Sequence, residues 1–400
     1  MDNNEIKKKL SSINWNFDFT IDYREGMLHP FNCRKYYSYP ATFIPEIPYA
    51  LIEILSQKGD VILDPFGGIG TTFIQALSLE RIPYSFDINP IATNVCKTLF
   101  MLFNPSLDKE IIKNQLLQLC EKYNEKKDYT VNISENQKEL FGWFEKVTFN
   151  ELSFLFQQCD QLDDTAMKAV MELVLSSILV TLSSQNKGWA YIADNVKPKE
   201  DEIRKKPVFE QYKISLKNLL NDIINYEGRL PSSFKNFYST ISRGERIFAD
   251  TILNSKMEEE TVDLIVTSPP YPRMIDYVKS QRLSFKFFNQ DFHEYINEET
   301  GARYRRCRKD SLASYESEIM HINEKASKLL KKGGYMCAVL PDYEITDDRK
   351  EVIEKVVENY TNLGLTKVFD VGRYIPSHKR TLSIQWATLV NERIYVFQKG

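Results

Sequence analysis

A glycine-rich turn near residue 64 combines residue types that suit a positively charged small molecule. The stretch Asp64–Thr72 follows the apolar run Val61–Leu63 and precedes an apolar-periodic segment that starts at Phe73. This order predicts a buried strand, a tight loop and the start of a helix, which Thr71 or Thr72 can cap. The glycines let the backbone turn sharply and approach a ligand, and the carboxylate at the end of the strand favours a cation over a phosphate. Because Phe73 stands where a dinucleotide-binding loop has a third glycine, that fingerprint is incomplete.

A second acidic residue stands at the end of the next predicted strand. Pro83–Phe86 has the composition of a strand, and Asp87 follows it directly. An acid about twenty residues beyond the glycines is placed to accept hydrogen bonds from ribose hydroxyls. Ile88 beside it offers apolar surface for an adenine ring. The alternative is that Asp87 caps the helix that follows Pro90.

A second turn, Thr267–Tyr271, follows the predicted strand Val262–Val266 and has the sequence Thr-Ser-Pro-Pro-Tyr. With Asp64–Thr72, it resembles the S-adenosylmethionine-dependent amino-methyltransferases that modify DNA. The first turn is similar to their cofactor loop, and Thr267–Tyr271 is similar to the catalytic motif of the cytosine-N4 branch. Relatives that act on adenine usually carry Asp at the position of Ser268. Two such turns, each at the end of a predicted strand, are a far more specific signal than one.

The resemblance implies which residues of this chain form the site. Asp250, at the end of a third predicted strand, occupies the place of an acid that contacts the cofactor's adenine amine. The residues implied to bind S-adenosyl-L-methionine are Asp64, Phe66, Gly67, Gly68, Gly70, Thr71, Thr72, Asp87, Ile88 and Asp250. The residues implied to be catalytic are Ser268, Pro269, Pro270 and Tyr271.

The catalytic turn has a physical rationale within that resemblance. An exocyclic amine of a base is a poor nucleophile because its lone pair is delocalised into the ring. The Ser268 hydroxyl and the Pro269 carbonyl can accept hydrogen bonds from the amine, and the prolines fix where that carbonyl points. Tyr271 then stacks on the base, which must leave the DNA helix to reach the site. The sulfonium methyl is already activated, so the protein mainly aligns the reacting atoms.

The resemblance therefore predicts a site-specific DNA methyltransferase that acts on cytosine N4, in restriction-modification or a related defence. Double-stranded DNA is the predicted partner, a cognate restriction endonuclease is a further candidate, and the oligomeric state stays open. Three alternatives remain: an adenine-N6 DNA methyltransferase, an RNA methyltransferase acting on guanine N2 of tRNA, and a non-catalytic nucleic-acid-binding subunit of the same fold. The RNA enzymes usually carry Asp in place of Ser268 and an additional RNA-binding module.

The predicted fold is α/β: a doubly wound, mostly parallel, seven-stranded methyltransferase sheet with a helical insertion. We expect an N-terminal extension over residues 1–27, a catalytic domain over 28–103 and 241–400, and the insertion over 104–240. The insertion is a candidate target-recognition region, although related enzymes usually place that region just before the catalytic strand. Helical spacing of apolar residues marks four of its segments: Lys109–Lys122, Lys138–Cys159, Ala166–Ser184 and Lys205–Tyr226.

Flanking elements complete this prediction. Closely spaced prolines favour a helix that starts only at Tyr49. A later helix over Ser317–Leu330 is expected to end at Lys331–Gly334, where cations and glycine suit a C-terminal cap. Leu365–Asp370 and Arg393–Phe397 are expected to form the last strands, as an antiparallel pair.

A net charge of −3 is a poor global indication of a nucleic-acid binder, so any phosphate contact must rely on a local basic face. Arg303–Lys309 places five cations within seven residues. The alternative is a solvated loop balanced by Glu294, Glu298 and Glu299. Two further stretches, Lys187–Tyr191 and the loop of residues 372–380, are weaker candidates. The predicted nucleic-acid contacts are Arg273, Lys279, Arg282, Arg303, Arg305, Arg306, Arg308 and Lys309.

Composition places the protein among soluble globular proteins, with 42% hydrophobic and 27% charged residues. No uninterrupted apolar run approaches the roughly 18 residues of a membrane span. The first residues lack the layout of a signal peptide, so we expect a cytoplasmic protein without a membrane partner. The six cysteines are scattered without a Cys-x-x-Cys pair, and no metal is predicted.

Overall fold

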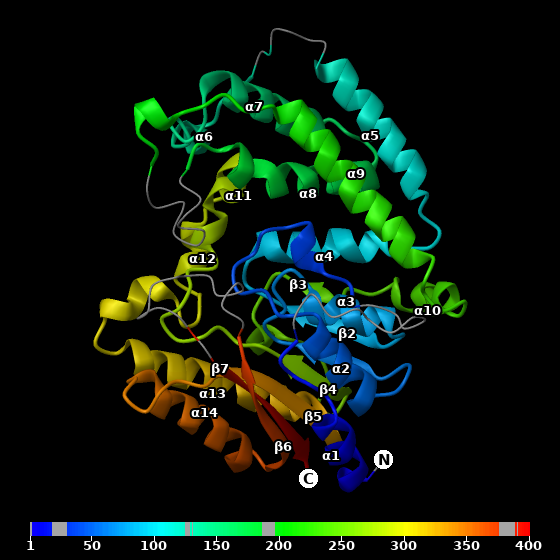
Figure 1. Ribbon diagram of the computed structural model, residues 1–400, viewed down its shortest axis with the longest axis vertical. Coiled ribbons are helices and arrows are strands. Elements are labelled where there is room, and N and C mark those ends of the chain that lie inside the picture. The colour runs from blue at the N-terminus through cyan, green and yellow to red at the C-terminus, as the bar shows by residue number, and fades with distance from the viewer. Residues whose placement is uncertain are drawn as a thin grey trace.

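A seven-stranded sheet forms the centre of the protein in a computed structural model that describes residues 2–17, 30–124, 129, 131–185, 197–375, 389 and 391–400 (Figure 1). Its strand order is β3-β2-β1-β4-β5-β7-β6. The neighbours from β3 to β5 pair in parallel, whereas β7 is antiparallel to both β5 and β6. The strands are β1 (Val61–Asp64), β2 (Ile82–Phe86), β3 (Ile247–Phe248), β4 (Val262–Thr267), β5 (Leu330–Pro341), β6 (Leu365–Tyr374) and β7 (Asn391–Lys399). The predicted mostly parallel seven-stranded sheet is confirmed, as is its antiparallel last pair.

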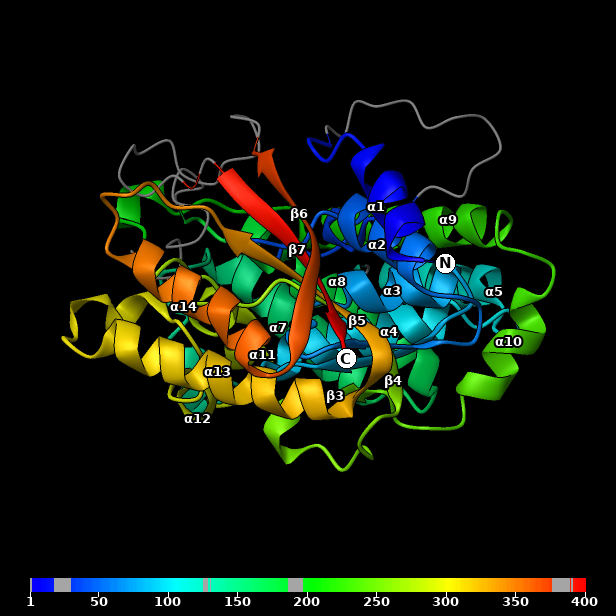
Figure 2. The same ribbon diagram turned by 90° about the horizontal axis from the view of Figure 1, so that it is seen from below.

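Helices cover both faces of this sheet, which is the doubly wound arrangement (Figure 2). One face packs against α1 (Asn3–Ser11) and α2 (Glu46–Leu55), and the other packs against α13 (Ser311–Leu329) and α14 (Arg349–Asn362). The central strands are therefore buried on both sides, which explains why they are continuous apolar runs instead of alternating patterns.

The insertion region folds as a layer of helices beyond the β3 side of the sheet (Figure 1). Its helix α8 packs against α4 of the sheet domain and against α7, α9 and α11. One continuous hydrophobic cluster runs from the glycine-turn helix α3 through α4 into this layer. The helices of this part of the protein are α3 (Thr71–Ser78), α4 (Pro90–Leu102), α5 (Lys109–Asn124), α6 (Glu135–Lys138), α7 (Lys146–Asp160), α8 (Thr165–Leu182), α9 (Val208–Glu227), α10 (Phe234–Ile241), α11 (Arg282–Phe287) and α12 (His293–Ile296).

Three local predictions about helix ends are wrong. Helix α2 begins at Glu46, because Pro48 lies in its first turn, where a missing N–H removes no helical hydrogen bond. The segment around Gly142 is not helical, since this residue has φ +88° and separates α6 from α7. Helix α13 passes directly into β5 at Leu330, so Lys331–Gly334 belongs to a strand and not to a helix cap.

Helix α8 is the one helix within the described ranges that is long and apolar enough to span a membrane, judged by length and composition alone. It has a mean hydropathy of 1.6, and 56% of it is buried inside the protein. Lys168 and Glu172 interrupt its apolar sequence. This packing is that of a core helix, and the fold supports a protein that does not span a membrane.

Candidate cofactor and catalytic site

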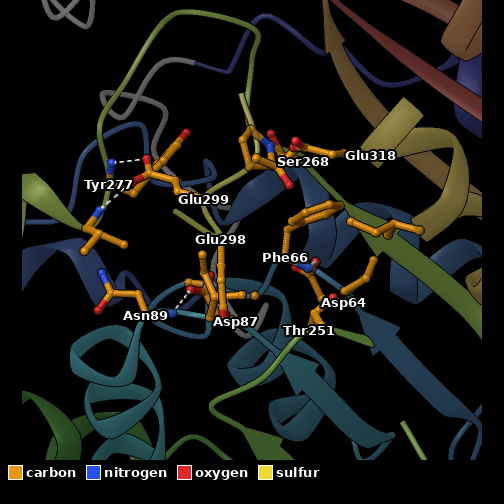
Figure 3. Close-up of a pocket in the computed structure, with 18 of the residues that line it drawn as sticks. Asp64, Phe66, Asp87, Asn89, Thr251, Ser268, Tyr277, Glu298, Glu299 and Glu318 are labelled. Atoms are coloured by element: carbon orange, nitrogen blue, oxygen red, sulfur yellow. Dashed lines mark hydrogen bonds between the residues drawn. The ribbon is translucent and has the colours of Figure 1, made fainter. Parts of the chain in front are cut away.

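The two predicted turns meet at the carboxyl edge of the sheet. Strands β1 and β4 are parallel neighbours, with Leu63 beside Ile265, so both turns leave the sheet at the same edge. The Thr267 hydroxyl donates to the Asp64 carboxylate at 2.8 Å. Both turns border one cavity of about 880 Å³ (Figure 3), near the upper end of the roughly 300–1,000 Å³ typical of ligand pockets. The expected juxtaposition of the two turns is confirmed.

Most of the predicted site residues line this cavity. Those that do are Asp64, Phe66, Gly67, Gly68, Thr71, Asp87, Ile88, Asp250, Ser268 and Pro270. The four that are not part of its lining are Gly70, Thr72, Pro269 and Tyr271. The structure therefore brings the two groups of residues together, while their individual roles stay predictions.

Asp64 is a buried carboxylate at the end of β1, with an exposed fraction of 3%. One of its oxygens accepts hydrogen bonds from the Phe66 backbone N–H, at 3.0 Å, and from Thr267. Burial raises the pKa of Asp64 to about 6, although these hydrogen bonds oppose the shift. A cation in the cavity would restore the charged form.

Asp87 lies at the end of β2 and holds the glycine turn in place. Its two carboxylate oxygens accept the backbone N–H groups of Gly68 and Asn89, each at 2.8 Å. The cap of α4 is Asn89, whose side chain accepts the Ile91 N–H at 3.0 Å, so the interpretation of Asp87 as a helix cap is wrong. Burial raises the pKa of Asp87 to about 6. Its remaining lone pairs are available to a ligand.

Two positions of the turn can only be occupied by glycine. A Cβ on Gly67 would lie 1.8 Å from the Ser85 hydroxyl, and one on Gly70 would lie 2.3 Å from the Cys96 sulfur. These two positions are therefore required by close packing on β2 and α4. Gly70 has φ +88° and itself occupies the N-cap of α3 without a side-chain hydrogen bond. The prediction that Thr71 or Thr72 caps this helix is wrong.

Several residues of the cavity carry no signal in the sequence. The Tyr39–Phe43 segment contributes one wall, and the ring of Tyr39 lies 5.8 Å from that of Tyr277 between centroids. Asn297–Thr300 and six residues of α13, among them Glu318 and His321, also line it. Asn297–Thr300 come from an irregular loop and the α13 residues from one face of a helix, so neither periodicity nor a motif could identify them.

Glu299 bears on the alternative interpretation of the basic run as a solvated loop. In that interpretation it balances solvated cations, but its exposed fraction is 3% and its carboxylate faces the Tyr277 and Val278 backbone (Figure 3). It accepts their N–H groups at 2.5 and 3.3 Å. Burial raises the pKa of Glu299 to about 8. This carboxylate therefore ties the segment after the catalytic turn to the cavity wall.

The cavity is rich in carboxylates. Six acidic residues line it, namely Asp64, Asp87, Asp250, Glu298, Glu299 and Glu318. The lining also holds aromatic rings and apolar residues such as Phe66 and Ile88, and among the described residues its one basic side chain is His321. This electrostatic character suits a ligand that has a positive charge and an apolar, planar part.

We predict that a cationic ligand binds this cavity more weakly as the pH falls through about 6. Asp64 and Asp87 both have a pKa raised to about 6, so each loses its negative charge below that value. Each protonation should raise the dissociation constant of the ligand by up to about tenfold for every pH unit below the pKa. Titration calorimetry with S-adenosylmethionine from pH 5 to pH 8, at constant ionic strength, measures the effect. A dissociation constant that stays flat across this range would contradict it.

The predicted DNA-contacting cations fall into three groups. Three arginines are held by carboxylates of the protein itself: Arg273 by Asp348 at 2.8 Å, Arg282 by Glu139 at 3.3 Å, and Arg305 by Glu318 at 3.1 Å. Lys279 and Arg303 are half-buried. Arg306, Arg308 and Lys309 are exposed.

The remaining candidate stretches add little to the exposed cations Arg306, Arg308 and Lys309. The alternative of a loop balanced by Glu294, Glu298 and Glu299 is wrong for Arg305, whose partner is Glu318. Arg373 is 1% exposed and pairs with Glu392, so it does not belong to a basic surface. Lys187–Tyr191 and residues 376–380 lie outside the described residues.

Comparisons with known proteins agree with this geometry. Residues 4–97 match the family model described as DNA methylase, N6_N4_Mtase. The chain is 28% identical to the Type II methyltransferase M.BsoBI of Geobacillus stearothermophilus, over 63% of this chain and 52% of the relative. It is 23% identical to M.MvaI of Kocuria varians, over 71% and 63%, and 22% identical to M.MjaII of Methanocaldococcus jannaschii, over 79% and 73%.

These findings support an amino-methyltransferase of the N4/N6 family, which is the resemblance that the two turns indicated. The methyl donor of this family is S-adenosylmethionine. The chain spans 52% and 63% of the length of the first two relatives.

Proposed function

We propose that this protein is a site-specific DNA methyltransferase that moves a methyl group from S-adenosylmethionine to the exocyclic amine of a flipped base. The observation that carries the proposal is the single acidic cavity bordered by both the glycine turn and the Ser-Pro-Pro-Tyr turn. The Type II methyltransferases among its relatives support a role in restriction-modification. We further propose that it acts in the cytoplasm on double-stranded DNA, with a cognate restriction endonuclease as a candidate partner.

The residues of the cavity fit the chemistry of that methyl donor. The sulfonium supplies an activated methyl group and carries a positive charge, which the carboxylate-rich lining stabilises. Asp87 lies at the end of β2, where the ribose hydroxyls of the cofactor require an acceptor. Asp250 lies near the end of β3, where the adenine amine requires one. Ile88 provides an apolar surface beside them. Ser268 lies on the same cavity and provides an acceptor for the amine of the target base.

We propose cytosine N4 as the target atom, with adenine N6 as the alternative. The proposal rests on Ser268, because relatives that act on adenine usually carry Asp there. A hydroxyl oxygen accepts a hydrogen bond from the amine without placing a second full charge beside Asp64. The RNA-directed alternative is weaker, since the family model that matches residues 4–97 is described as DNA methylase.

The experiment is mass spectrometry of nucleosides from DNA and from tRNA of cells that express the full chain. We expect N4-methylcytosine in DNA and no new modification in tRNA. N6-methyladenine would move the target to adenine, and a methylated guanine confined to tRNA would replace DNA by RNA as the substrate. Unmodified nucleic acids together with undetectable binding of S-adenosylmethionine would overturn the proposal in favour of a non-catalytic subunit.

We also propose that residues 28–103 and 241–400 form the catalytic domain and that 104–240 contribute to target recognition. The support is that 104–240 form a separate layer of helices, which meets the sheet domain through α8 on α4 and α11. The basic stretch of residues 273–309 is the competing candidate. Exchange of residues 104–240 for the matching region of a relative with a different recognition sequence distinguishes the two, because only the first assignment predicts a changed target sequence.

We predict that the exposed cations of the 3-10 helix η7 (Arg303–Cys307) and of the residues after it bind DNA phosphates. Changing Arg306, Arg308 and Lys309 together to alanine should weaken DNA binding about equally for all sequences. The slope of log affinity against log salt should decrease by about 2.7, because each lost phosphate contact contributes about 0.9. Filter binding or fluorescence anisotropy across a salt series measures this slope.

The matched control for this prediction is Arg282→Ala, which removes an arginine already paired with Glu139. Its salt slope should change by less than about 1. A triple variant with the slope of the unmodified protein would show that DNA runs elsewhere on the surface.

A further inference from the structure

The side chain of Tyr271 extends away from the glycine turn. Its hydroxyl donates to the Glu392 carboxylate, on β7, at 2.9 Å, and the other oxygen of Glu392 pairs with the buried Arg373. In the sheet, β1 and the glycine turn lie on one side of β4, whereas β5 and β7 lie on its other side. Tyr271 is also not part of the cavity lining. This orientation does not suit the stacking role that the sequence motif predicts for its ring, because a ring must face the base on which it stacks.

A second tyrosine of the same segment, Tyr277, borders the cavity. It lines the cavity together with Ser268 (Figure 3). Its ring centroid lies 5.8 Å from that of Tyr39, with 30° between the two ring planes. A Cβ built on Gly68 would lie 3.4 Å from the Tyr39 ring, so Tyr39 covers the glycine turn. Tyr39 thus connects the ring of Tyr277 to the turn where the methyl donor is proposed to bind.

Hydrogen bonds hold the backbone around Tyr277 in place. The Glu299 carboxylate accepts the N–H groups of Tyr277 and Val278. The Tyr304 N–H donates to the Asp276 carboxylate at 2.7 Å. Two backbone bonds extend this pairing: from the Arg273 N–H to the Gly301 carbonyl at 2.8 Å, and from the Arg303 N–H to the Ile275 carbonyl at 3.1 Å. The ring of Tyr277 is therefore presented on a preformed support.

The same pairing attaches η7 to the wall of the cavity. Arg303 and Tyr304 are the first residues of η7, which leads into the exposed cations that are predicted to bind DNA phosphates. A flipped base stays joined to its own sugar and phosphate, so the surface that stacks on the base must adjoin the surface that holds the backbone. Tyr277 and these cations meet this condition, because the hydrogen bonds fix one segment to the other.

We propose that Tyr277 is the ring that stacks on the flipped target base, and that Glu299 is the positioning residue that holds this ring at the cavity. The inference rests on the proposed function, because it names how the base of the same reaction is held. Stacking on Tyr277 stabilises the flipped state and so offsets part of the cost of unpairing and unstacking the base. The ring matters for this role, and the hydroxyl does not.

The first measurement is kcat/KM for methylation of a DNA that contains the methylated site, with full-length Tyr277→Leu and Tyr277→Phe. Leucine keeps apolar bulk without a ring, so kcat/KM should fall by roughly 5- to 150-fold, the effect of losing one base–aromatic stack. Phenylalanine keeps the ring and should recover most of this loss. The control is Tyr395→Leu, which removes a ring that packs on Phe397 outside the cavity lining and should keep full activity.

The second measurement separates stacking from a structural role of the ring. Binding is compared, with S-adenosylhomocysteine present, on a DNA with a mismatched target base, which flips at low cost, and on a DNA with an abasic site at the same position. Tyr277→Leu should bind the first DNA more weakly than the unmodified protein does and the second equally well, because an abasic site offers no base to stack. Glu299→Gln should show the same pattern and add no further loss to Tyr277→Leu, because both changes act on one ring.

Equal losses on the two DNAs would show that the ring of Tyr277 only supports the fold, which overturns the inference. Full activity of Tyr277→Leu in an active protein also overturns it. A loss confined to the base-containing DNA in Tyr271→Leu, and absent in Tyr277→Leu, would return the stacking role to the tyrosine of the catalytic turn. Absence of methyl transfer to any base by the unmodified protein overturns the proposed function, and this inference with it.

Discussion

Ser268→Ala is expected to lower kcat for methyl transfer by roughly 10²- to 10³-fold, the usual effect of removing one preorganised polar group from a reacting centre. The target amine would lose the hydroxyl oxygen that Ser268 contributes to the cavity lining. The lone pair of the amine nitrogen would then stay delocalised in the ring. Binding of S-adenosylmethionine should change by less than about threefold, because a loss confined to the reacting state lowers kcat and not ground-state affinity.

Single-turnover methylation of a DNA containing the recognised site, together with titration calorimetry of the cofactor, measures the two quantities separately. The matched control is Ser239→Ala, which removes an exposed hydroxyl from α10 and should retain full activity. A Ser268→Ala protein that transfers methyl groups at the normal rate would remove this serine from the reaction.

Asp87→Asn is expected to raise the dissociation constant for S-adenosylmethionine by roughly 100-fold. The free carboxylate accepts the N–H groups of Gly68 and Asn89 with its two oxygens, whereas an amide must turn its NH2 group toward one of these donors. The substitution therefore removes the negative charge and also disturbs the turn that shapes the cavity. Each lost hydrogen bond to a charged group accounts for about 1.5–3 kcal/mol.

Calorimetry at pH 8 measures this loss, since Asp87 is ionised there in the unmodified protein. Asp250→Asn provides a graded comparison, because the Asp250 side chain is exposed and bonded to Thr251 and Asn254. Its effect on affinity should be smaller. Equal affinities of the Asp87→Asn and unmodified proteins would mean that the cofactor does not contact the end of β2.

The sheet and the two turns could be predicted from local sequence because each depends on neighbouring residues. Val61–Leu63 and Leu264–Val266 are apolar on both faces, which only a strand covered on both sides satisfies. A residue at the end of such a strand lies at the carboxyl edge of a parallel sheet. Asp64, Asp87 and Ser268 therefore had to lie near one another once the strand order was set.

The walls of the cavity could not be predicted in this way. Tyr39 and Tyr277 lie far apart in the sequence, and they meet because separate loops cross the same sheet edge. Arg305 belongs to a run of cations that looks solvated in the sequence, but α13 brings Glu318 to it. Glu299 stands among surface acids in the sequence, and the backbone of Tyr277 buries it.

The sequence by itself determined the strands, the glycine turn, the Ser-Pro-Pro-Tyr turn and the acids at the strand ends. Backbone conformation and apolar periodicity are local properties, and a short segment carries them wherever it lies. Only the tertiary structure decided which charged groups face the cavity, which pair with each other, and how Glu392 reaches Tyr271. The protonation and direction of a polar group depend on its partners and burial, and these are contributed by segments more than a hundred residues away.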